Sequence, residues 1–454
     1  MTTSHGGFAG TNFGFTDTAM FDPDGTGPQV PRLVCTAVDA NAGPGGPNAL
    51  GIATFDAATG TWSPLGSGIV QGAARHLVVL PTGELVVGGA FSAIGGVACT
   101  NIARWTGATF APLGSGPGGS VSAMDVAPNG DLVAIAGSSV QRWDGSTWTS
   151  VGIVPANVSQ LAFAANGDIV ASHQGGFVRW NGSSWAPYAP GMTSVRNLAT
   201  MPNGDLLAAG QLAGQPLGNL HFAVWNGTGW TALGASWNFT LGLSEIRDFL
   251  FLPNGDPVAV GQYMFQPFAE HIGVHRWDGA AWTAFSTTAG PGRSATFTPE
   301  GRLYVASAAT LVSHQTTCPA QLLAAGNGCP GSGGANRLEV EERAWLGGTF
   351  RSRGHELPAL AFAAAAYGFA TLTVPLSIVF PQAPSGCDLL VTPDILQLVL
   401  VAGGQATSTM PIQPLVALLG TVFHHQIVPF EFDAGGALVS VTASNAVTAS
   451  VGSF

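Results

Sequence analysis

Four arginines occupy the same place in four copies of a repeated turn. Each stands eight residues before the glycine of its turn, and the four are Arg75, Arg196, Arg247 and Arg293. In the other copies the same position holds Asp17, Ser122 and Ser159. The next position is often polar, with His76, Gln160, Asn197, Asp248 and Ser294. If the strand before the turn is the innermost of its unit, these side chains ring one mouth of a central channel.

A ring of guanidinium groups would focus a positive potential in a chain whose formal net charge is −11. Guanidinium binds planar oxyanions through paired hydrogen bonds, so a carboxylate or sulfate group would fit. The alternative is that each arginine caps backbone carbonyls between units or pairs with a neighbouring acid. The predicted ligand-binding residues are Arg75, His76, Arg196, Asn197, Arg247, Asp248 and Arg293.

The elements that would position these residues recur along the first three hundred residues. The turn has the form P-x-G-[DE] before an apolar residue, as in Pro128-Asn129-Gly130-Asp131, and a degenerate first copy is Pro23-Asp24-Gly25. Asn-Gly and Asp-Gly between apolar runs are strong hairpin signals. After each turn come a Trp, a Gly turn and a second aromatic, as in Trp143 to Trp148. Aromatics at a fixed repeat position usually pack between units.

Each repeat therefore predicts four strands, and four strands every 37 to 51 residues are typical of propeller blades. Seven turns against six Trp hairpins indicate seven blades, with six as the alternative. The N-terminal residues would complete the last blade and close the ring. A second arginine series before the Trp is expected to form ion pairs within each blade: Arg104, Arg142, Arg179 and Arg276.

The composition changes near Thr317, where the repeat ends. We expect a β-propeller over residues 1–317, a Gly/Pro-rich linker over 318–334 and a small β-sandwich over 335–454. Residues 357–380 carry no charge and are long enough to span a bilayer. Their prolines, glycine and threonines favour two buried strands with a turn at Tyr367-Gly368 instead. The fold class is thus all-β.

Composition limits the function. With 14 basic residues against 25 acidic ones, the chain lacks the basic face that nucleic acid requires. The N-terminus has neither the basic nor the apolar region of a signal peptide. Five cysteines are too few for a disulfide scaffold, although two of Cys318, Cys329 and Cys387 could pair in an exported protein.

The repeat unit and the tail carry a family resemblance. The "IARW-G--W-PLG" and "PNGDLV-GG" phrases resemble kelch-like propeller repeats abundant in exported proteins of planctomycete bacteria. GNGCPGSGGANRL, WLGGTFRSRG, SGCDLLVTPD and HHQIVPFEFD resemble a C-terminal domain attached to many exported proteins of that group. The resemblance implies an extracellular or cell-envelope setting, so this chain would be a leaderless or trimmed form. It also implies that Cys329 pairs with Cys387, and it supplies no mechanism.

Other candidate sites are weaker. Asp22 and Asp24 resemble the start of a calcium loop, but the later acidic ligands are absent, and no other cofactor is indicated. His424 and His425 are adjacent, so on a strand they face opposite sides and cannot hold one ion together. His271 and His275 would lie about 13 Å apart. We expect both pairs to be surface or edge residues. No G-x-S-x-G, H-E-x-x-H or Walker sequence is present.

Three functions follow as hypotheses. The first is a non-catalytic extracellular propeller that binds an anionic polysaccharide or another surface protein at its channel mouth. The second is a polysaccharide lyase or glycoside hydrolase that uses the same rim, with His76 and Arg75 or Asp248 as its reactive groups. The third is a self-associating subunit of a surface fibre.

Overall fold

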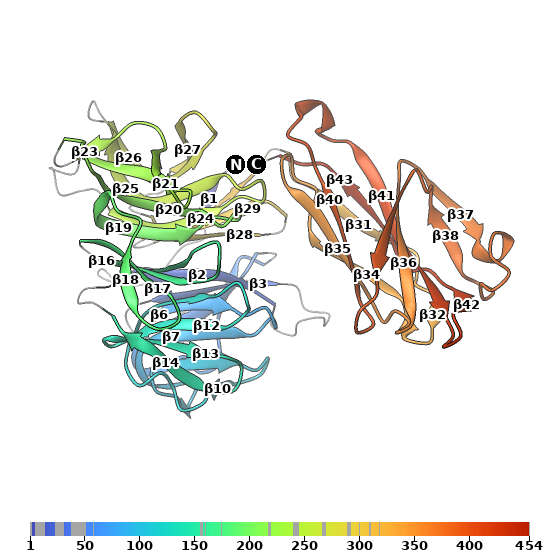
Figure 1. The fold of residues 1–454 in the computed structure, drawn as a ribbon, viewed down its shortest axis with the longest axis horizontal. Helices are drawn as coiled ribbons and strands as arrows, with labels where there is room; N and C mark the ends of the chain where they lie inside the picture. Colours follow the sequence, from blue (N-terminus) through green and yellow to red (C-terminus); the bar gives the residue numbers. More distant parts are fainter. Residues whose placement is uncertain are drawn as a thin grey trace.

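The computed structural model describes residues 2–4, 14–22, 31–37, 51–57, 59–154, 158, 160–173, 175–216, 219–238, 245–265, 269–287, 292–298, 300–307, 310–316 and 318–453. These residues form an almost entirely β structure with two parts (Figure 1). The first part is a propeller, and the second is a sandwich that begins at about residue 318.

The propeller consists of antiparallel four-stranded units in chain order. The first comprises β2 (Phe15–Phe21), β3 (Arg32–Ala37), β4 (Ile52–Asp56) and β5 (Thr61–Pro64). The second comprises β6 (Ile69–Val79), β7 (Leu85–Ile94), β9 (Ile102–Trp105) and β10 (Phe110–Pro112), with β8 (Val97–Ala98) beside β7. The third comprises β11 (Val121–Val126), β12 (Leu132–Ala136), β13 (Ser139–Trp143) and β14 (Trp148–Ile153). The fourth comprises β15 (Gln160–Phe163), β16 (Ile169–His173), β17 (Gly176–Trp180) and β18 (Trp185–Tyr188).

The later units follow the same order. The fifth comprises β19 (Met192–Thr200), β20 (Leu206–Leu212), β21 (Asn219–Trp225) and β22 (Trp230–Ala232). The sixth comprises β24 (Glu245–Phe251), β25 (Pro257–Phe265), β26 (Ala269–Trp277) and β27 (Trp282–Thr287). The seventh comprises β28 (Gly292–Phe297), β29 (Arg302–Ser307), β30 (Leu311–Gln315) and the N-terminal β1 (Thr2–Ser4). Because β23 (Trp237–Asn238) bonds to both β21 and β25, the fifth and sixth units share one sheet. The blade number therefore stays a prediction.

The first strand of each unit faces the centre. These strands contact one another in chain order, from β2 through β6, β11, β15, β19 and β24 to β28, and β28 returns to β2. The ring is closed. As expected, β1 pairs with β30 and completes the last unit with N-terminal residues.

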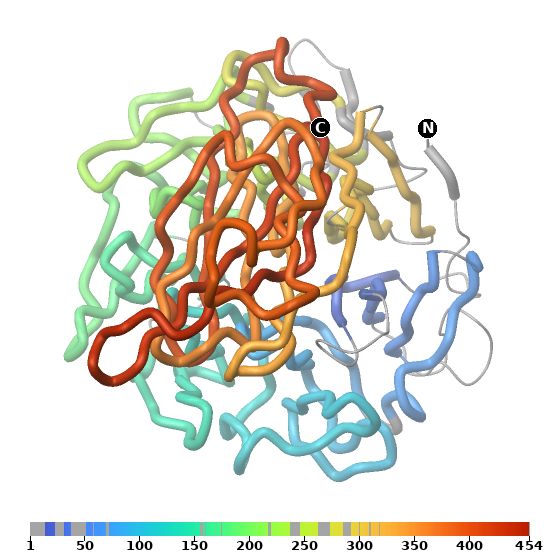
Figure 2. The backbone as a smooth tube through the Cα atoms, turned by 90° about the vertical axis from the view of Figure 1, so that its right-hand side faces the viewer, coloured from blue at the N-terminus to red at the C-terminus, as the bar shows by residue number. Residues whose placement is uncertain are grey.

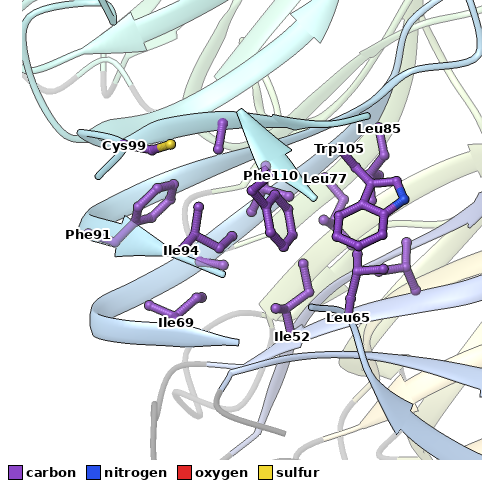
Figure 3. Close-up of a cluster of buried hydrophobic side chains, with 14 of the residues drawn as sticks. Ile52, Leu65, Ile69, Leu77, Leu85, Phe91, Ile94, Cys99, Trp105 and Phe110 are labelled. Carbon is purple, nitrogen blue, oxygen red and sulfur yellow. The ribbon is translucent and has the colours of Figure 1, made fainter. Parts of the chain in front are cut away.

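Apolar runs between glycine turns fill the space between units. All five residues of β12 are buried, because neighbouring sheets cover both faces of the strand. Figure 3 shows the layer between the first two units, where Ile52, Ile69, Leu85, Trp105 and Phe110 meet. Each Gly of the described P-x-G-[DE] turns has a positive φ, for example 89° at Gly130, which only glycine adopts without strain.

The tryptophans join units, as the sequence predicts. Trp143 lies opposite Trp148 in its hairpin, with ring centroids 5.5 Å apart. Trp148 Nε1 donates to the carbonyl of Leu113 in the preceding unit at 2.7 Å. The same bond links Trp230 to Ala189 at 3.0 Å.

The C-terminal part packs two sheets face to face. One contains β31 (Leu322–Ala325), β43 (Ala446–Ser450), β41 (Val422–Phe432), β36 (Ala361–Gly368), β39 (Ile395–Leu400) and β42 (Leu438–Val441). The other contains β34 (Arg337–Glu342), β35 (Thr349–His355) and β40 (Ala406–Pro411). Phe350, Tyr367 and Ile427 belong to the core between them. Two further hairpins are β32 (Pro330–Gly331) with β33 (Gly334–Ala335), and β37 (Thr371–Pro375) with β38 (Asp388–Val391). Single-turn 3₁₀ helices are η1 (Leu376–Ile378) and η2 (Val416–Leu418).

Two expectations for this part need correction. Residues 318–334 are not a free linker, because β31 hydrogen-bonds with β43 and forms an edge of the larger sheet. The histidine pairs are not confined to the surface, because His275 in the propeller is 2% exposed and His425 in the sandwich is completely buried. Its Nε2 lies 2.7 Å from Ser352 Oγ, and its ring stacks on Tyr367 at 4.2 Å. A satisfied polar pair in the core explains a histidine that the sequence pattern placed outside.

Two other segments can be compared with their predictions. The uncharged stretch at 357–380 forms β36 and β37, joined at residues 369–370, two residues after the predicted turn; β36 is largely buried as expected, whereas β37 is not. Among the described residues, no helix is long and apolar enough to cross a membrane. Cys329 and Cys387 are joined by a disulfide, with Cα atoms 5.4 Å apart.

The sandwich rests on the turns of the sixth and seventh propeller units. Arg343 Nη2 lies 3.1 Å from Glu300 Oε1, and the buried Trp345 ring covers Gly301. Figure 2 looks at the propeller with the sandwich in front of it. One end of the propeller therefore faces the sandwich.

Candidate functional site

A β-bulge near the start of the inner strand creates the candidate site. Ile246 pairs with Gly261 and Asp248 with Val260, so Arg247 is an extra residue without a partner in the ladder. The same arrangement occurs at Arg75 in β6 and at Arg293 in β28. Bulges re-aim side chains, and here they turn the arginines toward the channel.

The strand pairing corrects the sequence register in the first unit. Counting back from the turn glycine places Asp17 beside the arginines. In β2, however, Asp17 pairs with Thr36 and Thr16 is the extra residue of the bulge. Asp17 therefore corresponds to His76 and Asp248. The turn of this unit, with Asp24, lies outside the described residues.

A cavity of about 370 Å³ opens at the bulged end of the inner strands. Its lining consists of Phe15, Thr16, Arg75, His76, Ser122, Arg247 and Arg293. Three of the four predicted arginines and His76 therefore meet in one place. Arg196 lies in the corresponding irregularity of β19 but is not part of this lining.

A second cavity of about 510 Å³ shares Thr16, His76, Arg247 and Arg293 with the first and extends along the inner strands. It is also lined by Asn197 and Asp248, as the sequence predicts, and by Asp17, Asp125 and Gln160. The turn residue Asn254 lies six positions beyond Asp248, or roughly 20 Å along an extended strand. The arginine end of the channel is therefore the end away from the sandwich.

Two carboxyl groups meet behind the arginines. Ser294 Oγ lies 3.0 Å from Asp17 Oδ1 and 3.1 Å from Asp248 Oδ2. A serine hydroxyl has one hydrogen, so it can donate to only one of these oxygens. Each oxygen has a further donor, because Thr18 N lies 2.8 Å from Asp17 Oδ1 and Ala295 N lies 3.3 Å from Asp248 Oδ2. The two carboxyl groups therefore lie close together, with a single hydroxyl group between them.

The channel raises the pKa values of its carboxyl groups. Burial raises the pKa of Asp17 to about 7, and repulsion from Asp248 adds to this. Burial also raises the pKa of Asp248 to about 6 and that of Asp125 to about 6. Burial lowers the pKa of His76 to about 4, so this imidazole is neutral at pH 7.

Asp17 also links units around the ring closure. Its Oδ2 accepts a hydrogen bond from Leu77 N in β6 at 2.8 Å, while its Oδ1 faces Ser294 in β28. Asp248 lies in β24 and accepts from Ala295 N at 3.3 Å. The carboxyl pair therefore ties four consecutive inner strands together. Sequence reasoning missed this role because the residues lie 231 positions apart.

The arrangement offers two kinds of contact to a ligand. The arginines at the mouth provide positive charge for an oxyanion. The carboxyl, amide and imidazole groups deeper in the channel provide hydrogen bonds to neutral hydroxyls. The candidate calcium loop is described only in part. Asp22 lies within the described residues but Asp24 does not, and no group of three metal-ligating side chains occurs in the described part.

The second arginine series forms the predicted ion pairs within units. Arg104 Nη1 lies 2.7 Å from Glu84 Oε1, and Arg276 Nη2 lies 2.6 Å from Asp256 Oδ2. Arg142 and Arg179 pair with Asp131 and Asp168 in the same way. These four arginines lie on the third strand of their units and do not line the channel cavities.

Comparison with known proteins gives only distant likenesses. No family model matches the chain, and no curated protein matches it. A GH74 enzyme from Niastella koreensis is 12% identical with a TM-score of 0.47, covering 97% of this chain and 73% of that one. PorZ, a surface component of the type-IX secretion system of Porphyromonas gingivalis, is 12% identical with a TM-score of 0.44, covering 91% and 58%. YCF48 from Cyanidioschyzon merolae is 13% identical with a TM-score of 0.41, covering 69% and 98%.

These solved structures are β-propeller proteins. The chain described here is likewise an all-β propeller protein. Likenesses of this degree transfer no activity, so function must be argued from the residues of this chain.

Proposed function

We propose that the propeller is a binding module that holds an anionic ligand at the arginine end of its channel. The supporting observation is that bulges in the sixth, seventh and second units bring Arg247, Arg293 and Arg75 to the wall of one cavity. Acidic polysaccharide is the favoured ligand, because its carboxylates suit the arginines and its hydroxyls suit the polar groups deeper in the channel. An acidic segment of another surface protein is the alternative. The setting is extracellular or at the cell envelope, in line with the kelch-like, planctomycete-type resemblance of the sequence.

The carboxyl pair opposes an anion at the mouth less than two free carboxylates would. Because burial raises the pKa of Asp17 to about 7 and that of Asp248 to about 6, the pair carries less than two full negative charges at pH 7. Arg75 and Arg247 are exposed at the mouth, and the cavity lies at the end away from the sandwich. A polymer could thus reach the site from solvent.

Isothermal titration with an oligogalacturonate tests the proposal. The variant carrying Arg75→Ala and Arg247→Ala should bind at least tenfold more weakly, since two charge-assisted contacts are lost. A variant with Arg104→Ala and Arg276→Ala removes the same charge from the outer strands and should bind as the native chain does. Equal affinity of both double variants would refute the channel site. If the native chain itself binds no acidic oligosaccharide, a panel of acidic peptides decides whether the alternative ligand holds.

One observation keeps a hydrolase or lyase as a second candidate. Asp17 has a pKa of about 7, which suits a general acid at neutral pH, and a second carboxyl lies beside it. The nearest oxygens of the pair are at most about 6 Å apart, which is near the spacing of retaining glycosidases. Against this, the Ser294 hydroxyl stands between them. Product release from uronate polymers that disappears in Asp248→Asn would establish the activity, and prolonged incubation without products would exclude it.

A further inference from the structure

A side chain of the sandwich fills the groove between two propeller turns. Trp345 is 2% exposed and lies on Gly301 of the seventh unit, so close that a Cβ at Gly301 would be 2.3 Å from the indole ring. Gly347 and Gly348 follow it and lie against Asn254 and Pro253 of the sixth unit. The binding element is thus an aromatic side chain carried on a tight glycine turn.

The corresponding groove between the third and fourth units is open. It is a cavity of about 530 Å³ lined by Pro128 and Asn129 from one turn and by Gly167 from the next. These residues occupy the repeat positions of Pro253, Asn254 and Gly301.

The neighbouring grooves are closed by side chains of the propeller itself. A Cβ at Gly130 would meet Pro81 at 3.6 Å, and one at Gly204 would meet Ala165 at 3.1 Å. A Cβ at Gly167 would meet nothing within 4 Å. The space between the third and fourth units can therefore accept an aromatic ring from outside.

The walls of this groove add two features. The ring of Trp180 is half-buried and forms one side of it, which offers a second apolar surface. Arg142 also lines the groove, and its side chain is 47% exposed although it pairs with Asp131. An aromatic residue with a carboxylate beside it would complement this surface.

The sandwich exposes such an element at the turn between β36 and β37. Phe369 is 64% exposed and directly follows Gly368. Its backbone N–H donates to Asp394 Oδ2 at 2.8 Å, so a carboxylate lies next to the backbone of this residue. The adjacent edge strand β39 exposes Leu396, Leu398 and Leu400, at 62%, 68% and 79%. Apolar patches of this kind mark interaction surfaces.

We propose that the Phe369 turn of one copy of this chain docks in the groove between the third and fourth units of a second copy. Phe369 would lie on Gly167 and Trp180, as Trp345 lies on Gly301, and Asp394 would approach Arg142. The two surfaces differ, so the contact is head-to-tail and leaves a free turn at one end and a free groove at the other. Copies of the chain would therefore assemble in rows, as in the fibre-subunit hypothesis.

Sedimentation velocity on the full chain tests the contact. Because an interface made by one turn and one groove is small and should bind weakly, concentrations up to about 100 µM are needed. Mass should rise with concentration in the native chain. Phe369→Ser should keep the chain monomeric, whereas Leu323→Ser, which changes a 69% exposed leucine at the opposite edge of the same sheet, should not. Asn166→Trp should fill the groove and also prevent assembly.

Asn203→Trp is the matched control for the groove. Asn166 and Asn203 make the same two bonds, to Asp168 and to Asp205, so both variants lose the same local contacts. The groove beside Asn203 is already closed, and assembly should be unchanged.

Mixing the two blocked variants gives the decisive measurement. Phe369→Ser keeps its groove and Asn166→Trp keeps its turn, so an equimolar mixture should form dimers and nothing larger. A native chain that stays monomeric overturns the proposal. Assembly lost in Phe369→Ser but kept in Asn166→Trp also overturns it, and would indicate symmetric pairing through β39.

Discussion

Replacing Asp248 by asparagine should stabilise the protein at neutral pH by more than it does at acidic pH. Asn197 already occupies the same repeat position, where its Oδ1 accepts the N–H of Leu198 at 2.7 Å, so the amide fits. The substitution removes a carboxyl group whose pKa burial raises from 3.8 to about 6. It also removes the repulsion that helps to raise the pKa of Asp17.

The size of the effect follows from proton linkage. A pKa that is higher in the folded chain than in the unfolded chain stabilises the fold below pH 3.8, and this stabilisation is lost as the pH rises through 6. One pKa unit corresponds to about 1.4 kcal/mol, and Asp248 is partly exposed, so roughly 2–3 kcal/mol is expected. The free energy of unfolding of Asp248→Asn, minus that of the native chain, should therefore increase by this amount between pH 4 and pH 7.5.

The quantity to compare is the difference in the free energy of unfolding between Asp248→Asn and the native chain. The pH profile of either chain alone also contains the titration of other groups. Burial lowers the pKa values of His76 and His425 to about 4, and these groups change stability in the opposite direction over the same pH range. Urea unfolding followed by tryptophan fluorescence gives the required values, because 11 of the 12 tryptophans lie in the propeller.

Asp144→Asn is the control for this measurement. Hydrogen bonds from Thr147 N and Ser146 N hold the pKa of Asp144 well below its usual range, and asparagine stands at the same place in other units. Asp144 is therefore charged throughout the pH range, and its replacement should give a constant difference. A difference for Asp248→Asn that is equally flat, or that falls with pH, would refute the raised pKa of Asp248.

Three further substitutions have definite expected effects. Trp148→Phe removes the hydrogen bond to Leu113 in the preceding unit, so the midpoint of urea unfolding should fall by an amount equivalent to about 1 kcal/mol. The near-ultraviolet circular dichroism spectrum should change only by the contribution of the lost indole. Cys387→Ser opens a disulfide that spans 58 residues, and the sandwich should lose about 2–4 kcal/mol, a loss that reducing agent must reproduce in the native chain. His425→Phe leaves the Ser352 hydroxyl unpaired in the core, and calorimetry should show a loss of about 1–3 kcal/mol, whereas an unchanged melting temperature would mean that the pair contributes nothing.

The repeat made most of the propeller predictable from sequence. The turn glycines and the Trp hairpins recur at fixed places, and each local signal has one structural outcome, such as the positive φ at Gly130. The same register located Arg75, Arg247 and Arg293 on one cavity. The repeat therefore predicts both the strands and the position of these arginines.

Features without local periodicity could not be found this way. The bulge in β2 moves Asp17 by one place, and no pattern distinguishes Thr16 from Asp17 as the extra residue. The contact of Asp17 with Ser294 depends on closure of the ring over 277 positions. In the sandwich, His425 is buried because Ser352 on the opposite sheet satisfies it, and a single strand does not reveal its partner.

The pairing of β1 with β30 protects a sheet edge that could otherwise pair with another molecule. Three residues at the start of the sequence cover the outer edge of the last sheet, more than 300 positions away. If cleavage or a bulky addition displaced them, β30 would present bare N–H and C=O groups, a template for any extended strand. The first strand of another molecule is the best-fitting substitute, so damage at this one end would turn a self-contained ring into a strand-swapped chain of rings.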